Sequence, residues 1–263
     1  MLRWLGSHWQ LRDLGSRNGT FVNGERLRAH TTRALKCGDE LCFGSIREVW
    51  RLEDDAAPRP MLVTTDGDET LEASGDLITI NVEGEPAAAL VYDNKSGVWL
   101  LEELNGSRSP VEHGQVFSAG NRVWRFSSLP SATVPLEASC EPPLALRFRV
   151  SSDEEHVDIT AFESGREIVL GGRGHNYLLL TLARSRIHDR EAGIKPASSG
   201  WRYADDLVSD LRTSNTQLNL DVFRVRRHCA RLGLHSPTTI IERRVSSKQL
   251  RIGVENLTIE SLR

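Results

Sequence analysis

The 263-residue sequence lacks the features that mark several classes of protein. No apolar run approaches the roughly 20 residues that a membrane helix needs, so we expect no membrane association. The N-terminal residues contain no hydrophobic stretch of the kind found in a secretory signal peptide. Four cysteines are too few for a disulfide-rich scaffold, and no Cys/His group has the spacing of a zinc site. We therefore expect reduced thiols, a cytoplasmic location, and no metal or other cofactor.

Patterns that would indicate catalysis are also missing. The sequence shows no nucleophile–base arrangement, and its histidines are scattered. The glycine-rich stretch at residues 171–174 lacks both the Lys-Ser/Thr of a phosphate-binding P-loop and the spacing of a dinucleotide-binding turn. It is typical of a turn from a strand to a helix. We therefore expect that the protein is not an enzyme.

The formal net charge of −3 conceals three segments of different charge. Residues 1–53 hold 9 basic and 6 acidic residues, a net charge of +3. Residues 54–170 hold 8 and 21, a net charge of −13, and residues 171–263 hold 16 and 9, a net charge of +7. Such blocks predict separate modules with different partners. We expect a multidomain protein with β-rich and α+β parts.

The N-terminal segment has the pattern of a strand meander. Residues 8–27 read HWQLRDLGSRNGTFVNGERL, in which an alternating strand pattern is followed by a glycine-rich turn. A short β-rich run then leads to Asn23-Gly24, which is a strong two-residue hairpin signal. Further strands are expected around residues 40–44 and 49–52.

The stretch DLGSRNGTFVNG, followed by CGDELCFG, resembles the second half of a forkhead-associated (FHA) domain. The resemblance implies a β-sandwich that binds phosphothreonine peptides through loops at one end. Asn18 would bond the peptide backbone through its amide, Arg17 would add a bond to the phosphate, and Ser16 lies nearby. The alternative is that these residues only build the turn. For Gly15, Gly19 and Gly24 we expect only that they supply backbone freedom.

The family pattern also includes residues that precede this stretch. FHA domains carry an Arg after a Gly and then a Ser-x-x-His segment, which make the main phosphate contacts and brace the loops. Met1 stands just after the place of that His, so the resemblance implies that residues 1–53 are the C-terminal half of a truncated domain of ~100 residues. We expect such a half sandwich to expose strand edges and an apolar face.

Residues 54–136 are predicted to form a small, acidic, all-β region. Short strand-like runs are separated by Gly and Asn/Asp turns. A weak internal repeat is present: Trp9-x-Leu11 and Trp99-x-Leu101 are each followed by Gly-Ser-Arg. The repeat indicates either a duplicated β unit or generic hairpins, and generic hairpins are the simpler interpretation.

Residues 140–263 begin with strand patterns and continue with helices. Strands are expected at 144–150, 157–160 and 167–170, and helices at about 177–187 and 203–211. A third helix begins after Ser214, a plausible N-cap, and ends at Gly233. Its apolar residues at 218, 222, 225, 229 and 232 form one stripe.

The third helix also carries a basic ridge. Arg224, Arg227 and Arg231 lie at about 240°, 180° and 220° from Leu218, opposite the apolar stripe. A helix with one packed face and one arginine-lined face fits a DNA major groove. The alternative is an ordinary solvated basic face. The positive charge of the segment, together with a following hairpin around residues 240–253, favours DNA.

The order of strands, three helices and a hairpin resembles the winged-helix effector domain of OmpR/PhoB-type response regulators. LNLDVFRVRRHCARLG resembles the recognition helix of that family, and IIERRVSSKQLRIG its wing. By this resemblance, Arg224, Arg227 and Arg231 would face DNA, and Gln217 and Asn219 would reach bases or phosphates. Arg244 and Lys248 would lie on the wing and contact the backbone or the minor groove.

Two hypotheses of function follow. In the first, the protein is a bacterial-type signalling and transcriptional regulator, in which an FHA module recognises a phosphothreonine-containing protein. A Ser/Thr kinase supplies that mark, and the winged helix binds double-stranded DNA. In the second, the protein is a non-enzymatic adaptor whose winged helix does not bind DNA. DNA binding predicts a strong dependence on salt concentration, which separates the two.

Overall fold

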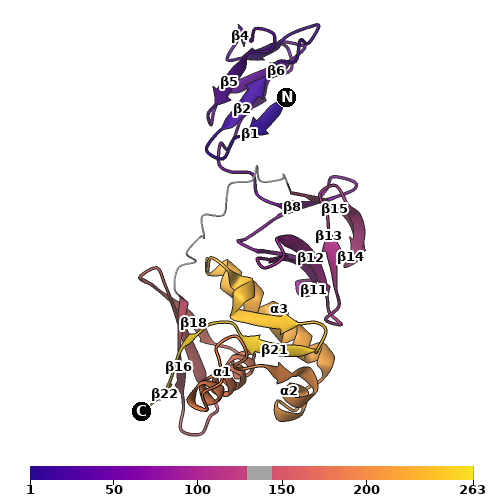
Figure 1. The fold of residues 1–263 in the computed structure, drawn as a ribbon. Coiled ribbons are helices and arrows are strands. Elements are labelled where there is room, and N and C mark those ends of the chain that lie inside the picture. Colours follow the sequence, from indigo (N-terminus) through magenta and orange to yellow (C-terminus); the bar gives the residue numbers. More distant parts are fainter. Residues whose placement is uncertain (129–143, 263) are drawn as a thin grey trace. The chain divides into compact units, whose positions relative to one another are not determined.

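The computed structural model describes residues 1–128 and 144–262 and divides into two compact units (Figure 1). In the described residues, the first unit is 1–59 and the second is 60–128 with 144–262. The sequence predicts three modules, but the acidic middle region and the C-terminal region pack into one unit. The predicted limits at 136 and 140, together with Cys140, lie outside the described residues.

The first unit is built from seven short strands in two sheets. One sheet has the order β1-β2-β5, the other β4-β3-β6-β7. The strands are β1 (Leu2–Trp4), β2 (Trp9–Arg12), β3 (Thr20–Val22), β4 (Glu25–Arg26), β5 (Thr32–Leu35), β6 (Glu40–Phe43) and β7 (Trp50–Arg51). A small core of Leu11, Val22, Leu35 and Leu41 lies between the sheets.

The expected exposure of apolar side chains is confirmed in the first unit. Among the described residues, eight of the fifteen exposed large hydrophobic side chains lie there. Trp50 in β7 is 64% exposed and Ile46 is 70% exposed. Three of the eight, Leu2, Phe43 and Trp50, lie in strands, and the others lie in connecting segments or at the N-terminus.

The second unit begins with a sandwich of eight strands, here called the middle sandwich. Its sheets have the orders β10-β11-β12-β13 and β14-β15-β8-β9. The strands are β8 (Met61–Thr64), β9 (Thr70–Glu72), β10 (Leu77–Val82), β11 (Glu85–Asp93), β12 (Val98–Glu103), β13 (Arg108–Val111), β14 (Val116–Ala119) and β15 (Arg122–Ser127). Trp99, Trp124 and Phe126 anchor its core.

The internal repeat of the sequence corresponds to matching strand pairings. β2 lies between β1 and β5, and β12 lies between β11 and β13. Trp9 pairs with Trp4 across the strands, and Trp99 pairs with Tyr92. The ring centroids are 5.6 Å apart in the first pair and 5.4 Å in the second.

The same correspondence continues beyond these strands. Gly38 N–H donates to the Leu52 carbonyl at 2.7 Å, and Gly114 N–H donates to the Phe126 carbonyl at 2.8 Å. These matched pairings favour a duplicated β unit over generic hairpins. In the first unit, the β3–β4 hairpin lies between β2 and β5 in the chain. In the middle sandwich, β13 follows β12 after a short turn, so this hairpin has no counterpart there.

The C-terminal part of the second unit combines two sheets with three helices. The strands β16 (Leu144–Val150), β17 (Val157–Glu163), β18 (Arg166–Gly172) and β22 (Asn256–Ser261) form one sheet. The helices are α1 (Asn176–Glu191), α2 (Ala204–Asp210) and α3 (Asn215–Arg231). β19 (Arg202–Tyr203), β21 (Gln249–Ile252) and β20 (Ile241–Arg244) form the second sheet, preceded by a 3-10 turn, Pro237–Ile240.

The helix predictions hold to within a few residues. Ser214 is the N-cap of α3, and its side chain accepts a hydrogen bond from the Gln217 N–H. The sequence did not predict β22, which pairs in parallel with β16. No helix among the described residues is long and apolar enough to cross a membrane.

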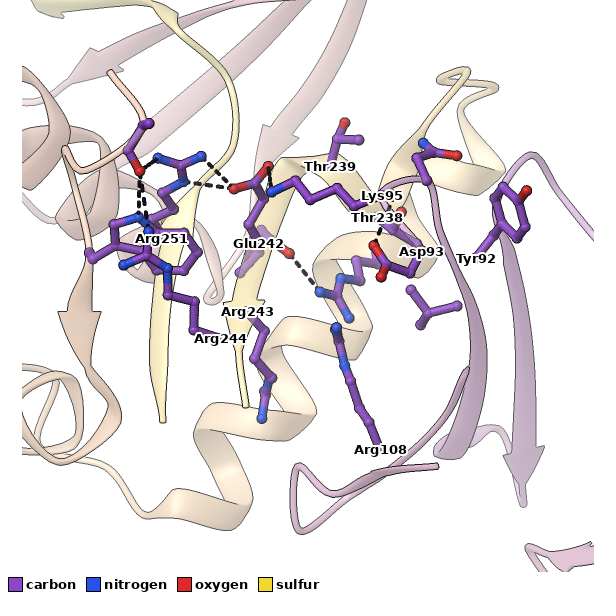
Figure 2. Close-up of a pocket in the computed structure, with 16 residues that line it drawn as sticks. Tyr92, Asp93, Lys95, Arg108, Thr238, Thr239, Glu242, Arg243, Arg244 and Arg251 are labelled. Atoms are coloured by element: carbon purple, nitrogen blue, oxygen red, sulfur yellow. Dashed lines mark hydrogen bonds and ion pairs between the residues drawn. The ribbon is translucent and has the colours of Figure 1, made fainter. Parts of the chain in front are cut away.

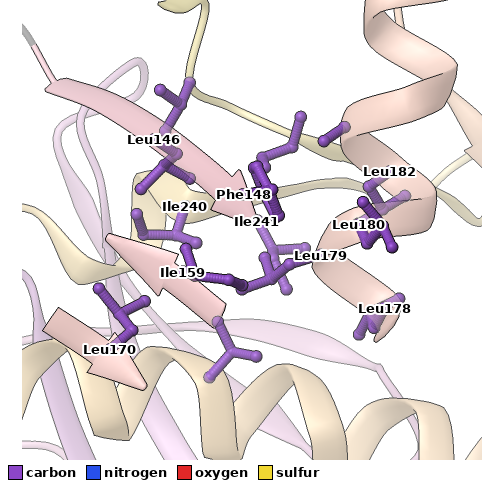
Figure 3. Packing of buried hydrophobic residues seen from close by; sticks show 14 of the residues in the cluster. Leu146, Phe148, Ile159, Leu170, Leu178, Leu179, Leu180, Leu182, Ile240 and Ile241 are labelled. Carbon is purple, nitrogen blue, oxygen red and sulfur yellow. The ribbon is translucent and has the colours of Figure 1, made fainter. Parts of the chain in front are cut away.

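The largest core of the molecule joins the sheets and helices of this part. Figure 3 shows Phe148 of β16 and Ile241 close to Leu179 of α1, and Ile240 close to Ile159 of β17. The apolar stripe of α3 completes this core. Outside this stripe, α3 also contacts the C-terminal sheets through His228, whose Nε2 lies 2.9 Å from the Leu170 carbonyl oxygen.

Candidate functional site

The first candidate site is the loop between β2 and β3. Ser16, Arg17 and Asn18 are all exposed, whereas Asp13 and Thr20 on either side of the loop are buried. Asp13 accepts hydrogen bonds from the Ser16 N–H at 3.0 Å and the Thr20 hydroxyl at 3.4 Å. Hydrogen bonds from Ser16 lower the pKa of Asp13. The buried carboxylate thus fixes the two ends of an exposed polar loop.

Glycines allow this loop its tight path. Gly15 and Gly19 have positive φ angles of +87° and +90°. A Cβ on Gly19 would lie 2.5 Å from Arg26 Nε, so this glycine also admits the arginine. The Gly44 N–H donates to the Gly19 carbonyl at 2.9 Å and ties the loop to the end of β6. The loop presents a hydroxyl, a guanidinium group and an amide, which are donors suited to a phosphorylated peptide.

Comparison with known proteins identifies this segment. Residues 1–44 match the model of the FHA domain. The N-terminal segment is an FHA domain. No curated protein and no solved structure matches the chain. An FHA domain implies phosphothreonine-dependent protein binding, so phosphothreonine-containing proteins are the partners that it suggests.

The structure places the three predicted FHA-domain residues together. Ser16, Arg17 and Asn18 are consecutive in the exposed loop. Asn18 also lies beside the end of β6, because a Cβ added to Gly44 would lie 3.5 Å from the Cβ of Asn18. The Asp13 side chain holds the loop in place by accepting hydrogen bonds from Ser16 and Thr20. The sequence pattern did not indicate this role.

The second candidate site is α3, whose inner face behaves as predicted. Leu218, Val222, Val225 and Cys229 are all buried in the C-terminal core. Burial raises the pKa of the Cys229 thiol to about 12, so this thiol stays protonated. The apolar stripe is therefore a packing surface.

The outer side of α3 packs against the middle sandwich. Phe223 is 2% exposed and contacts Leu77, Ala89 and Val91 of β10 and β11. The Ser74 hydroxyl donates to the Ala230 carbonyl at 3.3 Å. Close approach extends beyond the helix, since a Cβ on Gly75 would lie 2.3 Å from the His235 carbonyl oxygen. A phenylalanine in this position is a packing residue.

A buried cluster of charges joins the same two parts, here called the Glu102 cluster. Glu102 of β12 is fully buried and contacts three guanidinium groups, those of Arg108, Arg226 and Arg243. Its Oε2 lies 2.5 Å from Arg108 Nη2 and 3.0 Å from Arg226 Nη1. Arg226, 1% exposed, also donates to the Ile241 carbonyl at 2.6 Å.

The cluster determines the ionisation of Glu102. Burial alone would raise the pKa of this carboxyl, but Arg226, Arg108 and Arg243 outweigh burial and lower the pKa to about 2. Glu102 is therefore ionised over the physiological pH range. Three guanidinium groups share this one carboxylate, so the cluster carries an excess of positive charge.

The predicted basic ridge of α3 is divided by the middle sandwich. Arg224 forms an ion pair with Glu85 at 2.9 Å, and Arg227 donates to the Gly84 carbonyl at 2.8 Å. Arg231, in contrast, is exposed. The acidic middle region thus supplies partners for Arg224 and Arg227, although the Arg224 side chain remains 37% exposed. That these arginines face DNA stays a prediction.

The other predicted DNA contacts have different environments. Gln217 donates to Asp221 at 2.8 Å, and Asn219 is 7% exposed and accepts from Arg243 at 2.7 Å. Arg244 is exposed and its guanidinium group lies 3.9 Å from the Trp201 ring centroid. Lys248 is exposed in the β20–β21 turn, where its φ is +50°. Of the predicted DNA contacts, Arg231, Arg244 and Lys248 are exposed, and Gln217, Arg224 and Arg227 are partly exposed.

Proposed function

We propose that the protein is a phosphothreonine-directed adaptor, which is not an enzyme and acts in the cytoplasm. Its FHA domain would bind a partner that a Ser/Thr kinase has phosphorylated. The observation that carries this choice over a DNA-binding regulator is the packing of α3. Phe223 and Arg226, on the outer side of the helix, are each no more than 2% exposed because the middle sandwich covers them. The second unit would then serve as a scaffold that holds α3 internally.

The FHA loop gives this proposal a direct test. Replacing Asn18 with alanine should weaken binding of a phosphothreonine peptide at least tenfold, because one or two hydrogen bonds to the peptide are lost. Arg17→Ala should weaken binding through the phosphate. Binding would be measured by fluorescence anisotropy, with peptides selected from a phosphothreonine library and their unphosphorylated forms.

The control for this test is Arg3→Ala, which removes an exposed arginine of β1 in the same unit. It should leave peptide affinity unchanged. Equal affinity of Asn18→Ala and the wild type would refute the assignment of the loop. Equal affinity for phosphorylated and unphosphorylated peptides would refute phosphothreonine recognition.

A second candidate is the regulator that also binds DNA. The element order in its favour is α1, β19, α2, α3 and the β20–β21 hairpin, with β19-β21-β20 as a three-stranded sheet. This is the order expected of a winged helix. For α3 to enter a major groove, the middle sandwich would have to separate from it, since Glu85 and Gly84 contact the arginines that would face DNA.

Salt dependence tests the second candidate. If α3 binds DNA, affinity of the full chain for random duplex DNA should fall steeply between 50 and 200 mM salt, as expected for several phosphate contacts. Replacing both Arg224 and Arg227 with glutamate should then abolish binding. If the DNA affinity is weak and these substitutions do not change it, α3 is not the DNA-binding element. This result would favour the adaptor.

A further inference from the structure

A polar cavity lies beside the Glu102 cluster, within the second unit. It has a volume of about 470 Å³ and lies between the middle sandwich and the β20–β21 hairpin (Figure 2). This volume falls within the range of small-molecule sites, roughly 300–1,000 Å³. The proposed function does not use this cavity.

The lining of the cavity is strongly basic. Two acidic side chains, Asp93 and Glu242, face six basic ones, which are Lys95, Arg108, Arg226, Arg243, Arg244 and Arg251. The lining is thus basic, whereas the chain as a whole is slightly acidic. The lining therefore favours an anion.

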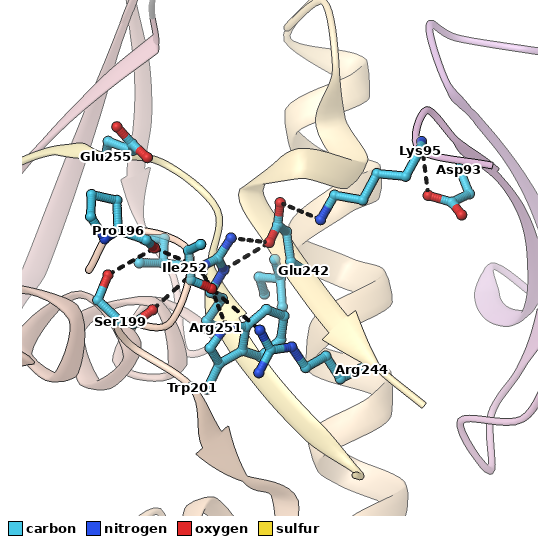
Figure 4. Close-up of polar contacts among 12 residues, drawn as sticks. Asp93, Lys95, Pro196, Ser199, Trp201, Glu242, Arg244, Arg251, Ile252 and Glu255 are labelled. Atoms are coloured by element: carbon cyan, nitrogen blue, oxygen red, sulfur yellow. Dashed lines mark hydrogen bonds and ion pairs between the residues drawn. The ribbon is translucent and has the colours of Figure 1, made fainter. Parts of the chain in front are cut away.

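The two acidic residues of the lining already have partners. Glu242 forms ion pairs with Arg251 and Lys95 (Figure 4). Its carboxylate oxygens lie 2.6 Å from Arg251 Nη2 and 3.9 Å from Lys95 Nζ. Asp93 accepts hydrogen bonds from the Ser96 hydroxyl and from the main-chain N–H of Lys95. Both carboxylates are therefore already engaged by neighbouring groups, and Arg108 of the Glu102 cluster also lowers the pKa of Asp93.

The Glu102 cluster places three guanidinium groups beside one carboxylate, with Asp76 near Arg226 and Asp93 near Arg108 as further acidic neighbours. Arg108, Arg226 and Arg243 share one carboxylate, and the side chain of Arg243 is 9% exposed. Burial, together with Arg226 and Arg108, lowers the pKa of Arg243 to about 10 although Glu102 opposes this change. Buried charge is costly unless it is paired, so a second anion would stabilise this site.

We propose that this cavity binds a phosphorylated small molecule, with its phosphoryl oxygens against the arginines of the cavity wall. Guanidinium groups suit this ligand because their planar forks donate paired hydrogen bonds to phosphoryl oxygens. The cavity is larger than inorganic phosphate requires, so it has room for a further group on the ligand. Arg244 and Lys95 lie at the open side, because Arg244 is exposed and the Lys95 side chain is 78% exposed.

Inorganic pyrophosphate is a suitable probe for this proposal. Isothermal titration of the full chain at constant ionic strength should show saturable binding, and the second unit should unfold at a higher temperature. Sodium chloride at equal ionic strength should give neither effect. Arg244→Ala and Lys95→Ala should each weaken pyrophosphate binding at least fivefold. Both side chains are exposed, so these variants should keep the fold, which circular dichroism verifies.

Two further variants show where the anion binds. Arg125→Ala removes an exposed arginine of β15 that does not line the cavity, and it should bind pyrophosphate as the wild type does. Asn18→Ala should also bind it normally, which separates this site from the FHA loop. The proposal is overturned if the wild type shows no saturable binding. It is equally overturned if Arg244→Ala and Lys95→Ala bind with wild-type affinity, or if Arg125→Ala is impaired as much as they are.

Discussion

Replacing Glu102 with glutamine is expected to destabilise the second unit by about 3–5 kcal/mol. The substitution removes the carboxylate that three guanidinium groups share, while Arg226 stays 1% exposed in the interface. Removing one partner of a buried ion pair leaves the others as uncompensated buried charge, which explains the large effect. Urea unfolding followed by tryptophan fluorescence would measure the change, since Trp99, Trp124 and Trp201 all lie in this unit.

The neighbouring Glu103 provides the matched control. Glu103 is exposed and follows Glu102 directly in β12, so its side chain points to the other face of the sheet. Glu103→Gln should change the free energy of unfolding by less than about 1 kcal/mol. Comparable losses in the two variants would contradict a special role for Glu102.

The ionisation of Glu102 also predicts a pH dependence. Its pKa of about 2 in the folded state lies below the ordinary value of 4.5. A lowered carboxyl pKa contributes stability that is present above the unfolded-state pKa and is lost as the pH falls through the folded-state pKa. The second unit should therefore lose about 3 kcal/mol between pH 5 and about pH 2 through this group. Glu102→Gln should lack this component of the acid transition.

Pairwise coupling would identify the interaction itself. Arg226→Met alone should also be strongly destabilising, because Glu102 then loses a partner at 3.0 Å. The double variant of Glu102→Gln and Arg226→Met should lose less than the sum of the two single losses, since both remove the same ion pair. Strict additivity would show that the two side chains act independently.

Local sequence patterns predicted the elements of this protein better than their packing. Period-2 alternation at residues 144–150 and the apolar stripe of α3 each correspond to an observed element, because both signals are set by neighbours close in the chain. β22 escaped prediction because its pairing with β16 joins residues more than a hundred positions apart. Turn chemistry also located the FHA loop, where Gly15 and Gly19 adopt positive φ angles.

The outer side of α3 shows why the candidate site was only partly predictable. A helical wheel identifies one buried stripe, and it then assigns the remaining residues to solvent. Phe223 and Arg226 did not belong to the stripe, yet both are buried by the middle sandwich. The sequence did contain one signal of this contact, because an acidic region precedes a basic helix. In the structure, Glu85 contacts Arg224 and Glu102 contacts Arg226. The specific pairing required the three-dimensional arrangement.

Phe223→Ala is expected to destabilise the second unit by about 3–4 kcal/mol, because a buried phenyl ring would leave a cavity between α3 and the middle sandwich. The same urea experiment measures this change. Arg231→Ala is the matched control, since Arg231 lies on the same helix but is exposed, and its removal should cost less than about 0.5 kcal/mol.

The two functions proposed for the C-terminal region predict opposite behaviour for Phe223. If α3 is a scaffold helix, Phe223→Ala lowers stability. The variant then binds duplex DNA at 50 mM salt as weakly as the wild type does. If the middle sandwich only covers a DNA-binding helix, loosening this contact exposes Arg224 and Arg227, so salt-sensitive DNA affinity should increase. An unchanged free energy of unfolding would contradict both interpretations, because each requires that the ring of Phe223 holds α3 against β10 and β11.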